Sequence, residues 1–306
     1  MKKLINILFF LFFVLSLSAQ NKLANAVHSI KNNEIEKAKE LIDAAAVDPM
    51  FKEMAATWYY RGNVYKELFK KHESDDKQSN YRSKSVEYFK KAILLDTSAK
   101  YEDNSRQNLR FLAETIYNHA AISFTTTSYP IAMSNYSKYK EIMSFAYPNT
   151  EFSEKDVMYH LALANTFSKI AEEDSASAEM YIKKAKENYE KVLELDSANV
   201  SANYNIGIIY YNKGVEIVNN MDYSLDLEQL VKIQDEVIEL FRKSLPYMKK
   251  AYDLDPKKKE TLIGLQGIYY SLNDIPKSEA FKKELELLEK SQNPSTEPKD
   301  VEMQED

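Results

Sequence analysis

Apolar residues recur along the chain at the three- and four-residue steps that place side chains on one face of a helix. One version of this pattern is a small residue, a large apolar residue, another apolar residue and an aspartate, at steps of four, three and four. It occurs three times, and a fourth copy is shortened by one residue. The copies are Ser85, Phe89, Ala92 and Asp96; Ala185, Tyr189, Val192 and Asp196; Ser244, Met248, Ala251 and Asp255; and Ala38, Ile42, Ala45 and Asp48. Each copy predicts a helix that ends at its aspartate.

A second pattern precedes two of these copies and follows the last of them. It is an aromatic or apolar residue, then a small or apolar residue, then a tyrosine. Trp58, Gly62 and Tyr65 show it, and Gly207 and Tyr210 repeat it; Leu262, Leu265 and Tyr269 give a third copy. A glycine inside a helix leaves room for a neighbouring helix to come close, so the two patterns predict pairs of tightly packed helices.

Composition supports a helical chain with few turns. The 306 residues include only five glycines and eight prolines, while 44% are hydrophobic and 29% charged. That balance is typical of a folded protein rather than a disordered one.

The alternation of the two patterns resembles the tetratricopeptide repeat, whose first helix reads W-x2-L-G-x2-Y and whose second reads A-x3-F-x2-A. Residues 56–65 and 202–211 resemble the first helix, and residues 85–96 and 185–199 resemble the second. The resemblance implies an all-α fold, a right-handed α-solenoid of about six TPR-like helix pairs with a concave groove. The pairs expected over residues 20–290 are 22–50, 52–97, 106–148, 154–199, 201–256 and 259–290.

The chain departs from the family pattern in the turn between the two helices of a pair. Ser85 lies twenty positions after Tyr65, and Ser244 lies thirty-four positions after Tyr210. The resemblance therefore implies elongated intra-repeat hairpins. Residues 70–83 are polar and predict an exposed, shapeless loop, whereas 170–180 predict two lengthened helices joined at Asp174–Ser177, with a serine as N-cap.

Residues 212–243 form the longest insertion. Their pattern predicts that the first helix continues to a turn at Asn219–Ser224, followed by a long amphipathic helix in which Pro246 predicts a kink. Two interpretations of its apolar stripe stay open: packing within its own hairpin, or docking onto another chain.

Both ends of the chain differ from the repeats. Residues 1–19 combine Lys2 and Lys3 with a short apolar run and a small-residue end at Ala19, which predicts a secretory signal peptide; a retained membrane anchor is the alternative. With the Lys-rich helices and no cysteine, this favours an exported bacterial protein of the periplasm, with secretion from the cell as the alternative. Residues 291–306 predict a disordered acidic tail.

Charge and motif content exclude several functions. The net charge of −6 favours neither nucleic acid nor an anionic membrane as a partner. Neither a phosphate-binding glycine loop nor a nucleophile motif occurs, and the four histidines lack the spacing of a metal site. We therefore expect no enzyme activity, no cofactor and no metal.

The resemblance implies where a ligand would bind, because the family lines its groove with residues of each first helix. A family member that grips a C-terminal carboxylate has a lysine where this chain has Tyr59, so an apolar or polar-neutral ligand is expected. We expect a non-catalytic scaffold of the cell envelope that binds a peptide or partner protein in the groove, and through the 212–243 hairpin as a second surface. The alternative is carbohydrate or another small ligand bound by tyrosines. The positions implied for partner binding are Tyr59, Asn63, Asn165, Tyr204, Ile208, Tyr211 and Tyr270.

Overall fold

A computed structural model describes residues 22–292, so the predicted leader at 1–19 and residues 293–306 of the predicted tail lie outside the described residues. The chain divides into two compact units, Met1–Phe152 and Ser153–Asp306. Within residues 22–292 every regular element is a helix. The predicted all-α fold is confirmed.

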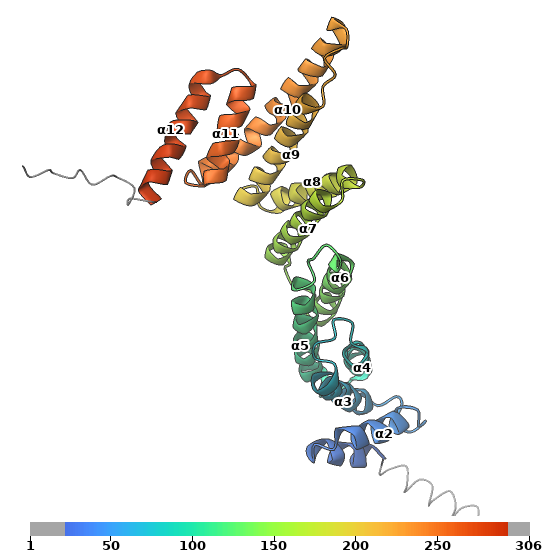
Figure 1. The fold of residues 1–306 in the computed structure, drawn as a ribbon. Helices are drawn as coiled ribbons and strands as arrows, with labels where there is room; N and C mark the ends of the chain where they lie inside the picture. Colours follow the sequence, from blue (N-terminus) through green and yellow to red (C-terminus); the bar gives the residue numbers. More distant parts are fainter. Residues whose placement is uncertain (1–21, 293–306) are drawn as a thin grey trace, which may run out of the picture. The chain divides into compact units, whose positions relative to one another are not determined.

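The first unit consists of consecutive helices that pack in pairs (Figure 1). A helix over residues 22–31 is followed by α2, α3 packs against α4, and α5 packs against α6; α2 also contacts α3, and α4 contacts α5. Each pair thus covers the next within this unit. The helices are α2 (Ile35–Ala46), α3 (Ala55–His72), α4 (Asn80–Leu95), α5 (Glu102–Ala121) and α6 (Tyr129–Ala146).

The second unit repeats this plan. The pairs are α7 with α8, α9 with α10 and α11 with α12, and α8 contacts α9 as α10 contacts α11. The helices are α7 (Ser153–Glu173), α8 (Ala178–Leu195), α9 (Val200–Asn219), α10 (Leu227–Leu254), α11 (Lys259–Ser271) and α12 (Ile275–Gln292).

Glycines of the first helix bring the two helices of a pair together. A Cβ added to Gly62 of α3 would lie 2.9 Å from the ring of Phe89 on α4. In the second unit, a Cβ on Gly207 would lie 3.2 Å from Met248 Cε, and one on Gly214 would lie 2.8 Å from the ring of Phe241. Gly207 and Gly214 are two turns apart on α9, so this close contact extends into the long insertion.

A buried serine on the second helix forms a hydrogen bond at the same contact between the two helices of a pair. Ser85 Oγ donates a hydrogen bond of 2.8 Å to the carbonyl of Gly62, and Ser244 Oγ donates one of 2.7 Å to the carbonyl of Gly207. Both serines are fully buried. The small residue that opens the second-helix pattern therefore supplies a hydrogen bond as well as space.

The prediction of a shapeless loop over 70–83 is wrong. Helix α3 continues to His72 and α4 begins at Asn80. The Glu73 carboxylate accepts hydrogen bonds from Ser79 Oγ (2.6 Å) and from the Tyr81 backbone N–H (2.9 Å), so it holds the start of α4. A carboxylate at a helix N-terminus also stabilises the helix dipole, which polar composition alone does not reveal.

Arg82 fixes the remainder of that loop. It is 2% exposed and donates hydrogen bonds to the Lys77 carbonyl (2.8 Å) and to His119 Nδ1 on α5 (2.9 Å). Asn135 Nδ2 on α6 reaches the same Lys77 carbonyl at 3.0 Å. The loop is thereby tied to the following helix pair.

The two other insertions follow their predictions more closely. Helices α7 and α8 flank Asp174–Ser177, and Ser177 stands at the N-cap position of α8. Its Oγ donates to the Asp174 carboxylate, however, and makes no cap hydrogen bond. Helix α9 ends at Asn219, and α10 begins at Leu227 after a capping box formed by Asp226 and Gln229. The predicted long hairpin is confirmed. Helix α10 continues through Pro246 without ending, and the kink stays a prediction.

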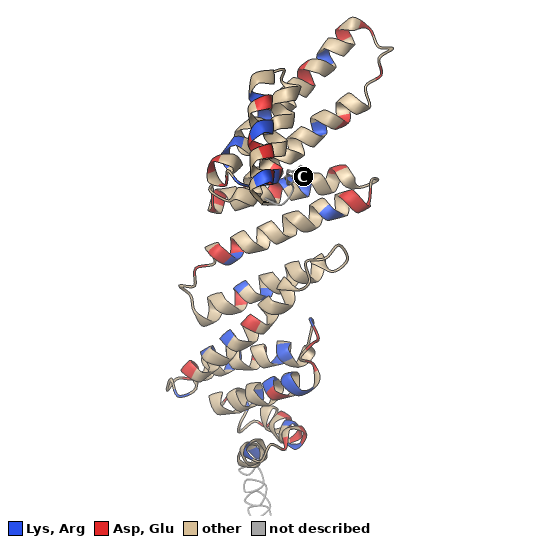
Figure 2. Ribbon diagram, turned by 60° about the vertical axis from the view of Figure 1, so that its left-hand side comes forward, with Lys and Arg blue, Asp and Glu red and all other residues tan. Residues whose placement is uncertain are grey.

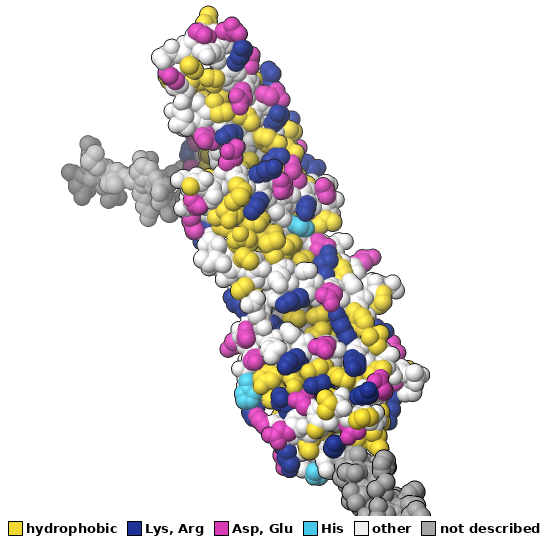
Figure 3. Space-filling model, turned by 90° about the vertical axis from the view of Figure 1, so that its right-hand side faces the viewer, with side chains coloured by type: hydrophobic (Ala, Val, Ile, Leu, Met, Phe, Trp, Pro, Cys, Tyr) yellow, Lys and Arg dark blue, Asp and Glu magenta, His cyan; other side chains and the backbone are white. Residues whose placement is uncertain are grey.

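Charged side chains of both signs are spread over the described helices (Figure 2). On the face drawn in Figure 3, apolar side chains lie between basic and acidic ones, with no large field of one sign. None of the helices in residues 22–292 is long and apolar enough to cross a membrane.

We expect Gly62→Ala to lower the free energy of unfolding by about 1–2 kcal/mol, because overpacking against the buried Phe89 ring outweighs the gain of about 1 kcal/mol in helix propensity. Urea denaturation measures the change. When Phe89→Leu is also present, Gly62→Ala should destabilise the chain much less, because the aromatic ring is gone. If Gly62→Ala lowers the free energy of unfolding equally with Phe89 and with leucine at position 89, the close contact is contradicted.

The stability of the first unit should fall as the pH drops below about 6.5, the ordinary histidine value. Burial and the neighbouring Arg82 guanidinium lower the pKa of His119, and arginine can only donate, so Nδ1 must stay unprotonated to accept its hydrogen bond. Because the folded-state pKa lies below the unfolded one, the unfolded chain gains protons first on acidification.

The control is His119→Asn, whose side-chain oxygen can accept the same hydrogen bond without titrating. The wild-type chain should lose more stability than this variant between pH 7.5 and pH 5.5 in urea denaturation. Parallel losses in both chains would assign the pH dependence to other groups.

Candidate functional site

A cleft of about 390 Å³ opens between the first helices of two successive pairs, α9 and α11. Tyr204, Ile208 and Tyr211 line it from α9, on the side of that helix that faces α11. Three of the seven residues implied by the sequence are therefore brought together in one place. Asn212 of α9 and Glu260, Ile263, Gly264, Gln266 and Gly267 of α11 complete its wall.

Tyr204 forms one end of this cleft. The Lys258 ammonium lies over its ring, 4.4 Å from the ring centroid, and burial together with the nearby charge of Glu260 raises the pKa of its hydroxyl. One ring face is thus used by Lys258, and the phenol stays protonated at neutral pH. Tyr204 can therefore offer an apolar ring edge and a hydroxyl to a ligand.

Tyr211 forms the other end of the cleft, and its hydroxyl has room there because the facing residue of α11 is a glycine. A Cβ on Gly267 would lie 2.7 Å from the Tyr211 hydroxyl oxygen, while the other side of the ring packs on Phe241, with centroids 5.5 Å apart. The position of Tyr211 is therefore set by α10 on one side and by a bare stretch of α11 on the other.

In the first unit, the implied residues Tyr59 and Asn63 lie together on α3. Asn63 Nδ2 donates to the Tyr59 carbonyl (3.0 Å), and the Tyr59 ring packs on Tyr101, with centroids 4.9 Å apart. Lys66 Nζ, one turn along, donates to Asn108 Oδ1 of α5 (2.8 Å), and burial lowers the pKa of its ammonium. Lys66 thus links α3 to α5.

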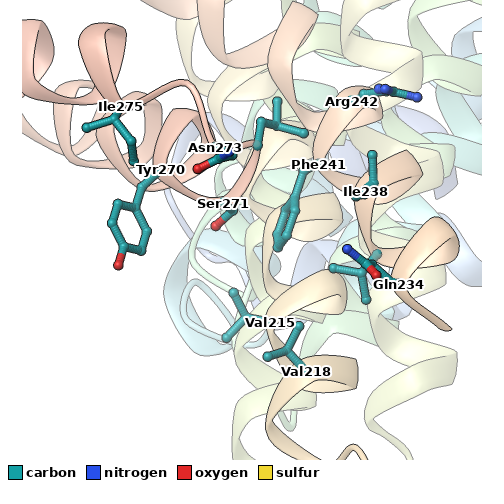
Figure 4. A pocket seen from close by; sticks show the side chains of 12 residues that line it. Val215, Val218, Gln234, Ile238, Phe241, Arg242, Tyr270, Ser271, Asn273 and Ile275 are labelled. Carbon is teal, nitrogen blue, oxygen red and sulfur yellow. The ribbon is translucent and has the colours of Figure 1, made fainter. Parts of the chain in front are cut away.

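The remaining two implied residues lie apart from the cleft between α9 and α11. Asn165 of α7 is exposed and accepts a hydrogen bond of 2.6 Å from the Tyr189 hydroxyl of α8. Tyr270 is 69% exposed and borders a second cleft, of about 600 Å³, between the α9–α10 hairpin and the turn from α11 to α12. In Figure 4 the ring of Phe241 points into this second cleft, between Val215 and the α11–α12 turn.

Part of the α11 wall has a signal in the sequence. Glu260, Ile263 and Gly267 follow one another at steps of three and four residues and so share one helix face. Gly264 and Gly267 break the otherwise apolar run of α11, and only the packing shows that Met248 and Tyr211 occupy the space they leave.

Each histidine within residues 22–292 lies within hydrogen-bond distance of a neighbouring side chain. The histidines lie on four different helices, and His160 Nδ1, for example, pairs with the Asn188 side chain at 2.8 Å. No group of three potential ligands among the described His, Asp and Glu side chains could hold a metal ion.

Residues 182–214 match the family model described as a TPR repeat. The match begins in α8 and ends in α9, and it includes Tyr204, Ile208 and Tyr211. The match to a TPR repeat therefore includes the part of α9 that supplies four of the nine residues lining the cleft between α9 and α11. No curated protein matches this sequence.

Two solved structures are similar to this chain at low scores. One is a monomeric mutant of IFIT1 with Gppp-AAAA, at 14% identity and a TM-score of 0.36, covering 84% of this chain and 48% of that chain. This chain thus spans about half the length of that protein. The other is BtubC (BKLC) from P. vanneervenii, at 16% identity and a TM-score of 0.26, covering 94% of this chain and 96% of that chain. At these scores neither likeness bears on function.

Proposed function

We propose that the chain is a non-catalytic interaction module that holds a segment of a partner protein in the cleft between α9 and α11. TPR repeats generally mediate protein–protein interaction and typically carry no catalysis, and the matched repeat supplies three side chains of this cleft. The observation that carries the proposal is this juxtaposition of Tyr204, Ile208 and Tyr211 opposite α11.

The chemistry of the cleft suits a polypeptide. Its wall alternates apolar groups with hydroxyl, amide and carboxylate groups, and the Lys258 and Glu260 charges lie at one end. A peptide segment offers apolar side chains and backbone hydrogen-bonding groups at a similar spacing. A sugar would need open aromatic faces, but Lys258 covers one face of Tyr204 and the Tyr59 ring packs on other rings.

Export is part of the same proposal. The charged start, short apolar run and small-residue end of residues 1–19 support delivery to the bacterial envelope, most simply to the periplasm. The partner would then be a protein of that compartment.

We expect Tyr204→Ala to weaken partner capture about tenfold, because truncating a partly buried aromatic side chain in an interface costs about 1–2 kcal/mol. A photo-crosslinking amino acid at Ile263, which is 47% exposed on the α11 wall, measures capture in the cells that make the protein. Circular dichroism checks that each variant folds.

Tyr223→Ala is the matched control, since it removes a tyrosine that is 75% exposed and remote from the cleft wall. It should leave the crosslinked product unchanged. Crosslinks to no polypeptide, or an equal loss with both variants, would overturn the proposed function.

A further inference from the structure

The long helix α10 carries two apolar faces, and only one is covered by its own hairpin. Val237, Phe241, Ser244 and Met248 are buried, and the glycines of α9 show that Phe241 and Met248 face α9. Leu227, Val231 and Ile238 lie on a neighbouring face, four and seven residues apart. Leu227 is 78% exposed and Val231 46% exposed, so packing within the hairpin does not account for this second face.

The second face is uncovered because the next pair is too short to reach it. Helix α10 has 28 residues and α11 has 13, and the distal part of the α9–α10 hairpin projects beyond α11 and α12 (Figures 1 and 2). The uncovered face continues into the cleft of about 600 Å³ (Figure 4), beside Val218, Tyr270 and Ile275, whose side chains are also exposed. We call Leu227, Val231 and Ile238 the outer stripe.

Charges along the edge of the outer stripe change sign halfway. Glu228, Asp235, Arg242 and Lys249 are spaced by seven residues, which keeps them on one side of the helix with a drift of about 20° per step. The order is therefore acid, acid, base, base. The whole hairpin follows this trend, since residues 222–239 hold six carboxylates and one lysine, while residues 240–250 hold four cations and no carboxylate.

We propose that the outer stripe is covered by α10 of a second copy of this chain, running antiparallel. An antiparallel pair with its two-fold axis between residues 238 and 239 brings Glu228 opposite Lys249 and Asp235 opposite Arg242. Because the contact is self-complementary, every such pair occurs twice. A parallel pair would instead bring like charges together along the whole edge, which is unfavourable.

The apolar stripe and the charges have separate roles in this contact. Residues 228–249 overlap over about 30 Å of helix at 1.5 Å per residue, and Val231 and Ile238 lose water there, while Leu227 lies one residue beyond the overlap. The ion pairs fix direction and register more than affinity. The existing contact of Glu228 with Lys232 does not compete strongly, because both side chains are more than 70% exposed and such pairs contribute little.

Engineered cysteines test the register, because the chain contains no cysteine of its own. Under mild oxidation, a mixture of Glu228→Cys and Lys249→Cys chains should form a disulfide-linked dimer, while either chain alone should give little. Efficient crosslinking of Glu228→Cys alone would indicate parallel pairing and overturn the proposal. The absence of crosslinking in the mixture would also overturn it.

Sedimentation of the full chain tests the association itself. The wild-type chain should show a concentration-dependent monomer–dimer equilibrium, and Val231→Glu should weaken it at least tenfold without lowering the helix signal. Asp235→Arg should weaken it too, and adding Arg242→Asp in the same chain should restore it. A wild-type chain that stays monomeric up to millimolar concentration would overturn the proposal. If Val231→Glu then abolished binding of a different protein, the outer stripe would be a docking surface for that protein and not for a second copy.

The Tyr204→Ala variant separates this inference from the proposed function. Tyr204 lies in the other cleft, so the variant should dimerise as the wild-type chain does. A wild-type chain that captures peptide but does not dimerise overturns the dimer proposal alone. A wild-type chain that dimerises but captures no peptide overturns the proposed function alone.

Discussion

The close contact of two helices at a glycine and a serine is the constraint on which the other features depend. At Gly62 and Gly207 the first helix has no side chain, so Phe89 and Met248 of the second helix fill the space. The buried hydroxyls of Ser85 and Ser244 then bond the glycine carbonyls, at the cost of placing a polar group in the core. A buried hydroxyl without that partner would be unfavourable, so serine and glycine depend on each other.

Packing a pair this tightly leaves its flanks to be covered by neighbouring pairs. Where the next pair lies alongside, as at the base of α9 and α11, the cover is nearly complete and leaves a narrow cleft. Where one pair is much longer than the next, part of its apolar surface stays in solvent. The exposed Leu227 and Val231 follow from the unequal lengths of α10 and α11. Both candidate binding surfaces of the second unit thus result from the same packing rule.

Much of the fold could be predicted from sequence because helix pairing is a local property. Gly62 and Ser85 belong to one pair, and their spacing along the chain already indicates that they meet. The organisation of the loop after α3 could not be predicted, because Glu73 and Arg82 act through partners in the Ser79 turn and on α5. Polar residues that form such contacts look the same in sequence as residues in solvent.

The candidate site was predictable only in part, for the same reason. Tyr204, Ile208 and Tyr211 share one helix face, so periodicity alone groups them. Which residues lie opposite depends on how α11 packs, and this in turn depends on Gly264 and Gly267 accepting Met248 and Tyr211. Tyr270 has the same residue type and a similar place in the pattern, yet it points to the other cleft.

Amide hydrogen exchange of a Ser244→Ala variant tests the central claim most directly. Loss of the hydroxyl leaves the Gly207 carbonyl without its side-chain partner, so protection in α9 and α10 should fall by about 1 kcal/mol, while α3 and α4, closed by Ser85, should keep theirs. Unchanged protection in α9 and α10, or an equal loss in α3 and α4, would contradict the account.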